Sequence, residues 1–137
     1  MTPQELKKLT VNLKVLYVED DKDLRESSTK MFGQFFDAID TAEDGQVGLN
    51  QYKKNTYDLV ITDIVMPHMS GVEMIEKIRT LNPNQAIIVT SAHNDANALF
   101  NLIDLGVDKF LLKPMDLGQL IDALIKIAFY IKNQQRI

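Results

Sequence analysis

The stretch from Tyr57 to Pro67 constrains this chain more than any other. As far as Asp63 it is an apolar run rich in Val and Ile, entered from the polar pair Asn55-Thr56. A short apolar run bounded by turn residues is typical of a strand that is buried on both faces of a parallel sheet. The run places Asp63 at its own end, and open sheets of this kind bind ligands outside the carboxyl ends of their strands. Asp63 is therefore the first candidate functional residue.

Further apolar runs alternate with segments of helical periodicity along the rest of the chain. The runs predict strands at 13–18, 38–42, 86–91 and 108–112, and the periodic segments predict helices at 21–35, 44–52, 70–81, 95–105 and 116–132. Strands and helices that alternate five times predict an α/β domain with a parallel sheet and helices on both faces. Residues 1–12 are expected to form a lead-in turn or frayed helix, and residues 134–137 a short tail.

The composition excludes several functional classes. A chain of 137 residues with 45% hydrophobic and 25% charged residues fits one ordinary globular domain. Cysteine is absent, so any metal site must use other ligands. The net charge of −4 argues against a nucleic-acid-binding module. The sequence has neither a signal-peptide pattern nor a run near the ~18 apolar residues of a membrane span, so we expect a soluble, cytoplasmic protein without membrane contact.

Polar side chains follow most of the predicted strands at the point where each strand ends. Each has an ordinary explanation when taken alone, such as a helix cap, a turn residue or a solvated lysine. Taken together they are more informative, because the carboxyl ends of parallel strands meet at one edge of the sheet. The residues expected at this edge are Glu19, Asp20, Asp63, Thr90, Ser91 and Lys113.

Three carboxylates at one edge need cations. Within about 5 Å, each pair of carboxylates would repel by roughly 3 kcal/mol at an effective dielectric constant near 20. Lys113 supplies one positive charge, and a divalent ion bound by oxygen would supply more. Mg²⁺ suits such a site because it binds one or two carboxylates, keeps several waters and accepts phosphate oxygens. A carboxylate beside this ion can attack a phosphoryl donor and become an aspartyl phosphate, a reaction that depends on positioning and charge.

Four motifs in combination resemble the receiver domain of two-component response regulators. They are residues 18–21 (VEDD), 63–71 (DIVMPHMSG), 90–92 (TSA) and 110–114 (FLLKP). The resemblance covers about residues 13–133. It implies a flavodoxin-like fold of the chemotaxis-regulator type, with strand order 2-1-3-4-5, five helices and three α/β/α layers. It also implies a signalling switch that takes a phosphoryl group from a sensor histidine kinase or phosphotransfer protein.

The resemblance also implies roles for individual residues. Asp63 would be the phosphoacceptor, and Lys113 would pair with the phosphoryl oxygens. The ligands of Mg²⁺, or of Mn²⁺, would be Asp20, Asp63, the backbone carbonyl of Val65 and, through water, Glu19. The domain would therefore catalyse only its own phosphorylation and slow dephosphorylation, and would not be an enzyme in the usual sense.

The hydroxyl of the site has two adjacent candidates, Thr90 and Ser91, and strand alternation lets only one point inward. We expect Ser91, because the family places this residue twenty-two positions before the lysine and follows it with a small residue. Phe110 takes the position of the family's switch aromatic, although ordinary core packing is the alternative.

Several loop residues complete the comparison. Pro67 and Gly71 are expected to shape the loop after Asp63, and Pro114 to follow a cis peptide bond. Val65 and His93 occupy positions that tune phosphoryl lifetime in the family, and His93 as a solvated loop residue is the alternative reading.

Other functions are also compatible with parts of this pattern. A phosphatase of the haloacid-dehalogenase kind also uses an Asp nucleophile and Mg²⁺, but it needs a second Asp where this chain has Val65. A flavodoxin-like cofactor binder and a degenerate receiver acting only as an interaction module are further alternatives. The complete set of acidic, hydroxyl and lysine residues argues against degeneracy.

The resemblance places the switching surface on the helix at 95–105, the strand at 108–112 and the last helix. The last helix carries a surplus apolar stripe, Ile121, Ile125 and Phe129, which makes a homodimer through this surface plausible. The sequence leaves open whether an output domain or a separate protein receives the signal.

Overall fold

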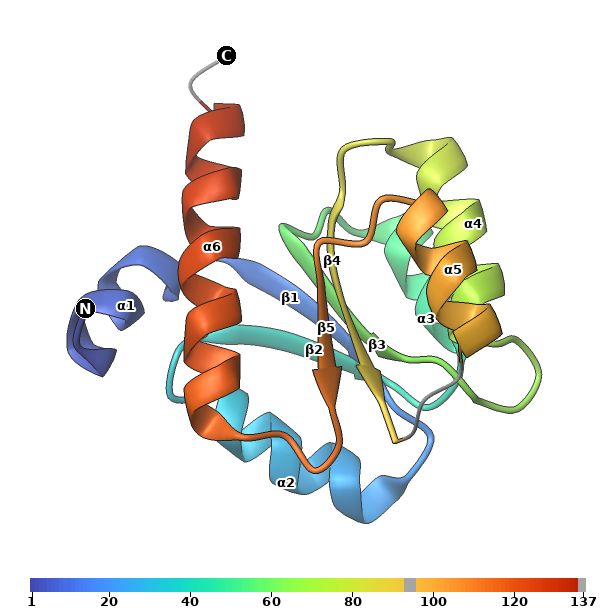
Figure 1. The fold of residues 1–137 in the computed structure, drawn as a ribbon, viewed down its shortest axis with the longest axis horizontal. Helices are drawn as coiled ribbons and strands as arrows, with labels where there is room; N and C mark the ends of the chain where they lie inside the picture. Colours follow the sequence, from blue (N-terminus) through green and yellow to red (C-terminus); the bar gives the residue numbers. More distant parts are fainter. Residues whose placement is uncertain (93–95, 136–137) are drawn as a thin grey trace.

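The computed structural model describes residues 1–92 and 96–135. Its five strands form one parallel sheet in the order β2-β1-β3-β4-β5, which confirms the predicted topology (Figure 1). The strands are β1 (Lys14–Val18), β2 (Ala38–Ala42), β3 (Leu59–Asp63), β4 (Ala86–Ser91) and β5 (Lys109–Leu112). Every residue of β3 and β4 is buried, as expected for central strands of a parallel sheet covered on both faces.

Within the described residues, six helices cover the two faces of the sheet. They are α1 (Pro3–Thr10), α2 (Lys22–Phe32), α3 (Gly45–Lys54), α4 (Gly71–Leu81), α5 (Ala96–Asp104) and α6 (Leu117–Gln135). The apolar cluster on one face joins α1, α2 and α6 to the sheet, and the cluster on the other face joins α3, α4 and α5 (Figure 1). Strand residues alternate between these clusters, as a side-chain period of two requires.

The N-terminal segment is a packed helix, so the prediction of five helices was wrong. The Thr2 side chain caps α1 by accepting from the backbone N–H of Glu5, and Pro3 lies in the first turn. Leu6 is fully buried in the cluster shared with α6. Thr10 is also buried, and its hydroxyl donates to the carbonyl of Phe35 at 2.7 Å. The helix is therefore fixed by tertiary contacts, which the mostly polar sequence of residues 1–12 does not reveal.

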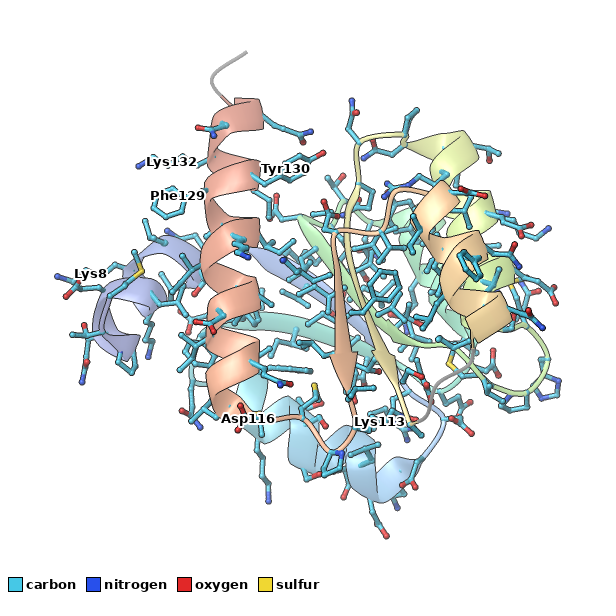
Figure 2. The ribbon with its side chains drawn as sticks, in the orientation of Figure 1. Lys8, Lys113, Asp116, Phe129, Tyr130 and Lys132 are labelled. Carbon is cyan, nitrogen blue, oxygen red and sulfur yellow. The ribbon has the colours of Figure 1, made fainter. Side chains whose placement is uncertain are left out.

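The surplus stripe of α6 is also less exposed than expected. Ile121 and Ile125 are partly buried against the cluster that joins α1, α2 and α6 to the sheet. Phe129 and its neighbour Tyr130 stay largely exposed near the C-terminal end of the helix (Figure 2). The stripe is therefore mostly part of the core.

Helix caps at the carboxyl edge of the sheet set where the chain turns. The side chains of Asp21, Asp44 and Ser70 each accept a backbone N–H in the first turn of the following helix. Gly106 follows the C-terminal end of α5 and has a φ of 74°, which agrees with the predicted left-handed cap.

Among the residues described, no helix is long and apolar enough to cross a bilayer. A cytoplasmic location stays a prediction.

Candidate functional site

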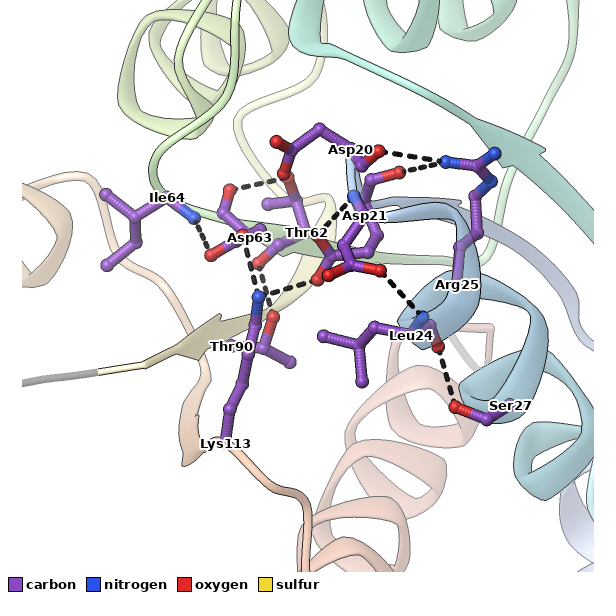
Figure 3. A network of polar contacts seen from close by, with 11 residues as sticks. Asp20, Asp21, Leu24, Arg25, Ser27, Thr62, Asp63, Ile64, Thr90 and Lys113 are labelled. Carbon is purple, nitrogen blue, oxygen red and sulfur yellow. Dashed lines mark hydrogen bonds and ion pairs between the residues drawn. The ribbon is translucent and has the colours of Figure 1, made fainter.

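Three carboxylates converge at the carboxyl edge of the sheet (Figure 3). Glu19 and Asp20 directly follow β1, and Asp63 is the last residue of the neighbouring strand β3. One oxygen from each side chain lies within 4.8 Å of an oxygen of the other two. Glu19 is fully buried and Asp63 nearly so, whereas Asp20 is exposed. This arrangement offers only oxygen ligands, with one open side, and fits a hard divalent cation such as Mg²⁺.

The ammonium group of Lys113 bridges two of these carboxylates. Its Nζ lies 2.6 Å from Oε1 of Glu19 and 2.7 Å from Oδ2 of Asp63. Lys113 comes from the loop after β5, and in Figure 3 its amino group points into the acidic pocket. Three carboxylates and one ammonium leave a formal charge of −2 at the pocket. A divalent cation would neutralise this charge.

Burial and pairing shift the pKa values of Glu19 and Lys113. Burial raises the pKa of Glu19 above its usual range, and the hydrogen bond from Lys113 offsets only part of this effect. Burial acts to lower the pKa of Lys113, but the two carboxylates outweigh it and the pKa is raised. The two results agree physically, because one ammonium is shared between two acids. Lys113 therefore stays charged while Glu19 is held less firmly in its charged form.

The loop after Asp63 is fixed by close backbone packing. Oδ1 of Asp63 accepts the backbone N–H of Ile64 at 2.7 Å, and the N–H of Gly71 donates to the carbonyl of Ile64 at 2.7 Å. A Cβ at position 71 would overlap the carbonyl oxygen of Asp63, so only glycine fits there. Inside this loop the Pro67 carbonyl accepts the N–H of Met69, and His68 has a φ of 66°. The predicted loop-shaping role of Gly71 thus has a direct steric basis.

The two candidate hydroxyls occupy different environments. The register pairs Thr90 with Asp63, and the Thr90 hydroxyl donates to the backbone carbonyl of Thr62 at 3.4 Å. Ser91 lies one residue further along β4 and is nearly buried. Its carbonyl accepts the N–H of Lys113 at 2.8 Å, so the two backbone segments are adjacent. Register alone favours Thr90 as the neighbour of Asp63, and the assignment of Ser91 stays a prediction that rests on the family spacing.

The remaining predicted residues lie around this pocket. Val65 is 72% exposed in the loop after Asp63, so its side chain leaves the site open to solvent. Phe110 lies on β5 and is partly exposed, at 37%. The peptide bond between Lys113 and Pro114 is cis, as predicted. His93 lies outside the described residues.

One contact of the site was not predicted from the sequence. The guanidinium of Arg25, in the first turns of α2, donates to the carbonyl of Glu19 at 2.7 Å. A cation near a helix N-terminus opposes the helix dipole, but Lys22 also lies at the start of α2, so the sequence does not single out Arg25.

The chain matches the response regulator receiver domain family over residues 15–125. It belongs to this family. It is 33% identical over 109 residues to the response regulator ArlR of Staphylococcus saprophyticus subsp. saprophyticus, a match that covers 79% of this chain and 49% of that protein. It is also 30% identical over 123 residues to hybrid signal transduction histidine kinase D of Dictyostelium discoideum, covering 88% of this chain and 8% of that protein. The chain therefore spans at most about half the length of these relatives.

Solved receiver domains have the same fold. The N-terminal domain of an uncharacterized protein from Wolinella succinogenes has a TM-score of 0.82 at 35% identity, with coverage of 90% of this chain and 99% of that one. CheY in the CheX-CheY-BeF₃-Mg²⁺ complex from Borrelia burgdorferi has a TM-score of 0.81 at 26% identity, with 93% and 98% covered. This receiver is thus a signalling domain with a flavodoxin-like fold.

Proposed function

We propose that this receiver accepts a phosphoryl group on Asp63 in a reaction that depends on Mg²⁺ or Mn²⁺. The observation that carries the proposal is the shared contact of Lys113 with Asp63 and Glu19, beside the exposed carboxylate of Asp20. The site has a carboxylate nucleophile, a fixed cation and a pair of acids for a metal ion. These are the parts that phosphoryl transfer needs, because positioning and charge neutralisation supply most of its catalysis.

Each residue has a definite part in the proposed reaction. An oxygen of Asp63 attacks the phosphorus of a phosphohistidine, so that an O–P bond forms while the N–P bond breaks and its electron pair returns to the imidazole. Lys113 moves from the carboxylates to the phosphoryl oxygens, which carry the spreading negative charge. Asp20, Asp63 and the Val65 carbonyl hold the metal directly, and Glu19 holds it through water. The metal supplies further neutralisation of the phosphoryl oxygens.

The proposed donor is a sensor histidine kinase or a phosphotransfer protein. Two relatives support this choice: one bears the name of a hybrid histidine kinase, and CheY of Borrelia forms a complex that contains BeF₃ and Mg²⁺. Beryllofluoride resembles a phosphoryl group in shape and charge. Ser91 is proposed to bind the phosphoryl group, and Phe110 to move with it. Val65 and His93 are proposed to set the lifetime of the aspartyl phosphate.

The proposed output surface is formed by α5, β5 and α6. Exposed apolar side chains occur on each of these elements, namely Phe100, Ile103, Phe110, Leu112 and Phe129. Exposed apolar groups in such number favour a partner over a solvated face. We propose a homodimer or a downstream protein as that partner.

Sedimentation can test the homodimer. Beryllofluoride with Mg²⁺ should shift the protein toward a dimer, and Phe100→Asp should prevent the shift. An unchanged monomer at high concentration would exclude the homodimer.

The deciding experiment is labelling with ³²P-acetyl phosphate. We expect Mg²⁺-dependent label in the wild type and none in Asp63→Asn, because the amide is a poor nucleophile. Asp58→Asn is the matched control. Asp58 lies just before β3, away from the pocket, and its carboxylate accepts the backbone N–H of Lys14. An amide oxygen can accept the same hydrogen bond. Label that survives in Asp63→Asn would disprove the phosphoacceptor. Multiple turnover on a phosphate ester would instead favour a phosphatase.

A further inference from the structure

Arg25 fixes the backbone that carries the two acids after β1. The residue belongs to α2, and its side chain turns back across the start of its own helix (Figure 3). One nitrogen, Nη1, lies 2.7 Å from the carbonyl oxygen of Glu19 and 3.4 Å from that of Asp20. The side chain is half-buried. Arg25 therefore spans the β1–α2 turn from the inside of the loop.

The two acids differ in how firmly their side chains are held. The oxygens of the Glu19 carboxylate accept from Lys113 Nζ and from the backbone N–H of Asp21. The carboxylate of Asp20 is exposed and accepts no hydrogen bond from the part of the chain that the structure describes. Its position in the pocket is therefore set by its backbone, and Arg25 is the side chain that binds this backbone.

We propose that Arg25 is a positioning residue that raises the affinity of the acidic pocket for a divalent cation. It does so by holding the carbonyls of Glu19 and Asp20, so that both carboxylates converge on Asp63 before the cation arrives. Groups that orient metal ligands from outside the ligand set commonly change metal affinity by roughly 10- to 100-fold. The inference rests on the metal site of the proposed function.

The charge of Arg25 and its hydrogen bonds predict opposite changes in metal affinity when the residue is replaced. A guanidinium close to a divalent cation repels it, so electrostatics alone predicts tighter metal binding when Arg25 is neutralised. Loss of positioning predicts weaker binding, because the Asp20 backbone is released. The sign of the change therefore separates the two effects.

The test is direct titration with Mn²⁺, followed by the electron paramagnetic resonance signal of the free ion. We expect Arg25→Gln to weaken binding by about tenfold. Arg25→Lys keeps the charge and places an N–H donor group one bond short of Nη1, so it should recover part of the affinity. Lys30→Gln is the matched control, because it removes the same charge from an exposed position on the same helix, and its affinity should not change. Urea unfolding with EDTA present checks that each variant is folded.

The outcomes separate this inference from the proposed function. Unchanged or tighter Mn²⁺ binding by folded Arg25→Gln would overturn the positioning role while leaving the metal site intact. If Arg25→Gln does not fold, wild-type affinity in Arg25→Lys would overturn the role, since the lysine nitrogen ends one bond short of Nη1 and should recover only part of the two carbonyl contacts. A wild-type protein that fails to bind Mn²⁺ would reject the metal site itself.

Discussion

Lys113 and Glu19 lie 94 positions apart in the chain, yet Nζ of one is 2.6 Å from Oε1 of the other. The same nitrogen contacts Asp63 on the strand between them. The pocket thus depends on a cation delivered by the loop after β5, and its acids are packed more closely than carboxylates alone would tolerate.

Removing this cation should destabilise the fold until a metal replaces it. We expect Lys113→Met to lower the free energy of unfolding in EDTA by about 3 kcal/mol, because it leaves two largely buried carboxylates without the cation that pairs with them. Saturating Mg²⁺ should restore part of the loss. Urea unfolding measures both effects, with the exposed Lys132→Met as control. Equal stability of the two variants in EDTA would contradict the bridging role.

The raised pKa of Glu19 should make the stability of the protein depend on pH. Above its ordinary pKa of 4.5, Glu19 loses its proton in the unfolded chain before it does so in the native state. The native state then binds more protons, so the contribution of Glu19 to the free energy of unfolding falls as pH rises through this window and is level above the folded-state pKa. Urea unfolding in EDTA measures this effect. The free energy of unfolding of the wild type minus that of Glu19→Gln should decrease as the pH rises from about 4.5. A difference that grows with pH would mean that pairing outweighs burial.

Gly71 should not tolerate a side chain. A methyl group there would overlap the carbonyl oxygen of Asp63, so Gly71→Ala should displace the phosphoacceptor strand end and cost about 2–4 kcal/mol of stability. Gly118→Ala is the control, because its methyl would meet only the end of the Asp116 side chain in the first turn of α6, where alanine favours the helix. Thermal unfolding compares the two. Equal melting temperatures would show that the loop after Asp63 relaxes easily.

The choice between the two hydroxyls can be made by deleting each. We expect Ser91→Ala to reduce labelling by acetyl phosphate at least several-fold, and Thr90→Val to retain labelling while losing about 1 kcal/mol of stability with its hydrogen bond to Thr62. The reverse pattern would assign the phosphoryl contact to Thr90, as the strand register alone suggests.

Helix α1 should contribute to global stability. Leu6 is fully buried, so Leu6→Ala should cost about 2–5 kcal/mol of unfolding free energy. The exposed Lys7→Ala on the same helix should change it little. If Leu6→Ala leaves the free energy of unfolding unchanged, the packing of α1 does not contribute to the stability of the domain.

The sequence by itself determined the sheet and most of its edge. An apolar run such as the one before Asp63 is typical of a strand buried on both faces of a parallel sheet, and the alternating helices predict its connections. The meeting of Glu19, Asp63 and Lys113 at one edge was therefore predictable, whereas the strand order came from the resemblance to receiver domains. The sequence also marked Gly71 as a residue that shapes the loop, although its structural reason is the close approach of the Asp63 carbonyl.

Tertiary structure decided what depends on contacts between distant segments. Helix α1 is polar over most of its length, and the packing of Leu6 in the core together with the hydrogen bond from Thr10 to Phe35 makes it part of the domain. The packing of Ile121 and Ile125 against the same cluster removed most of the free apolar stripe on α6. The reach of Arg25 back to the carbonyl of Glu19, and the sharing of one ammonium by two acids, follow from side-chain direction and burial. Neither property has a period or spacing that a sequence can display.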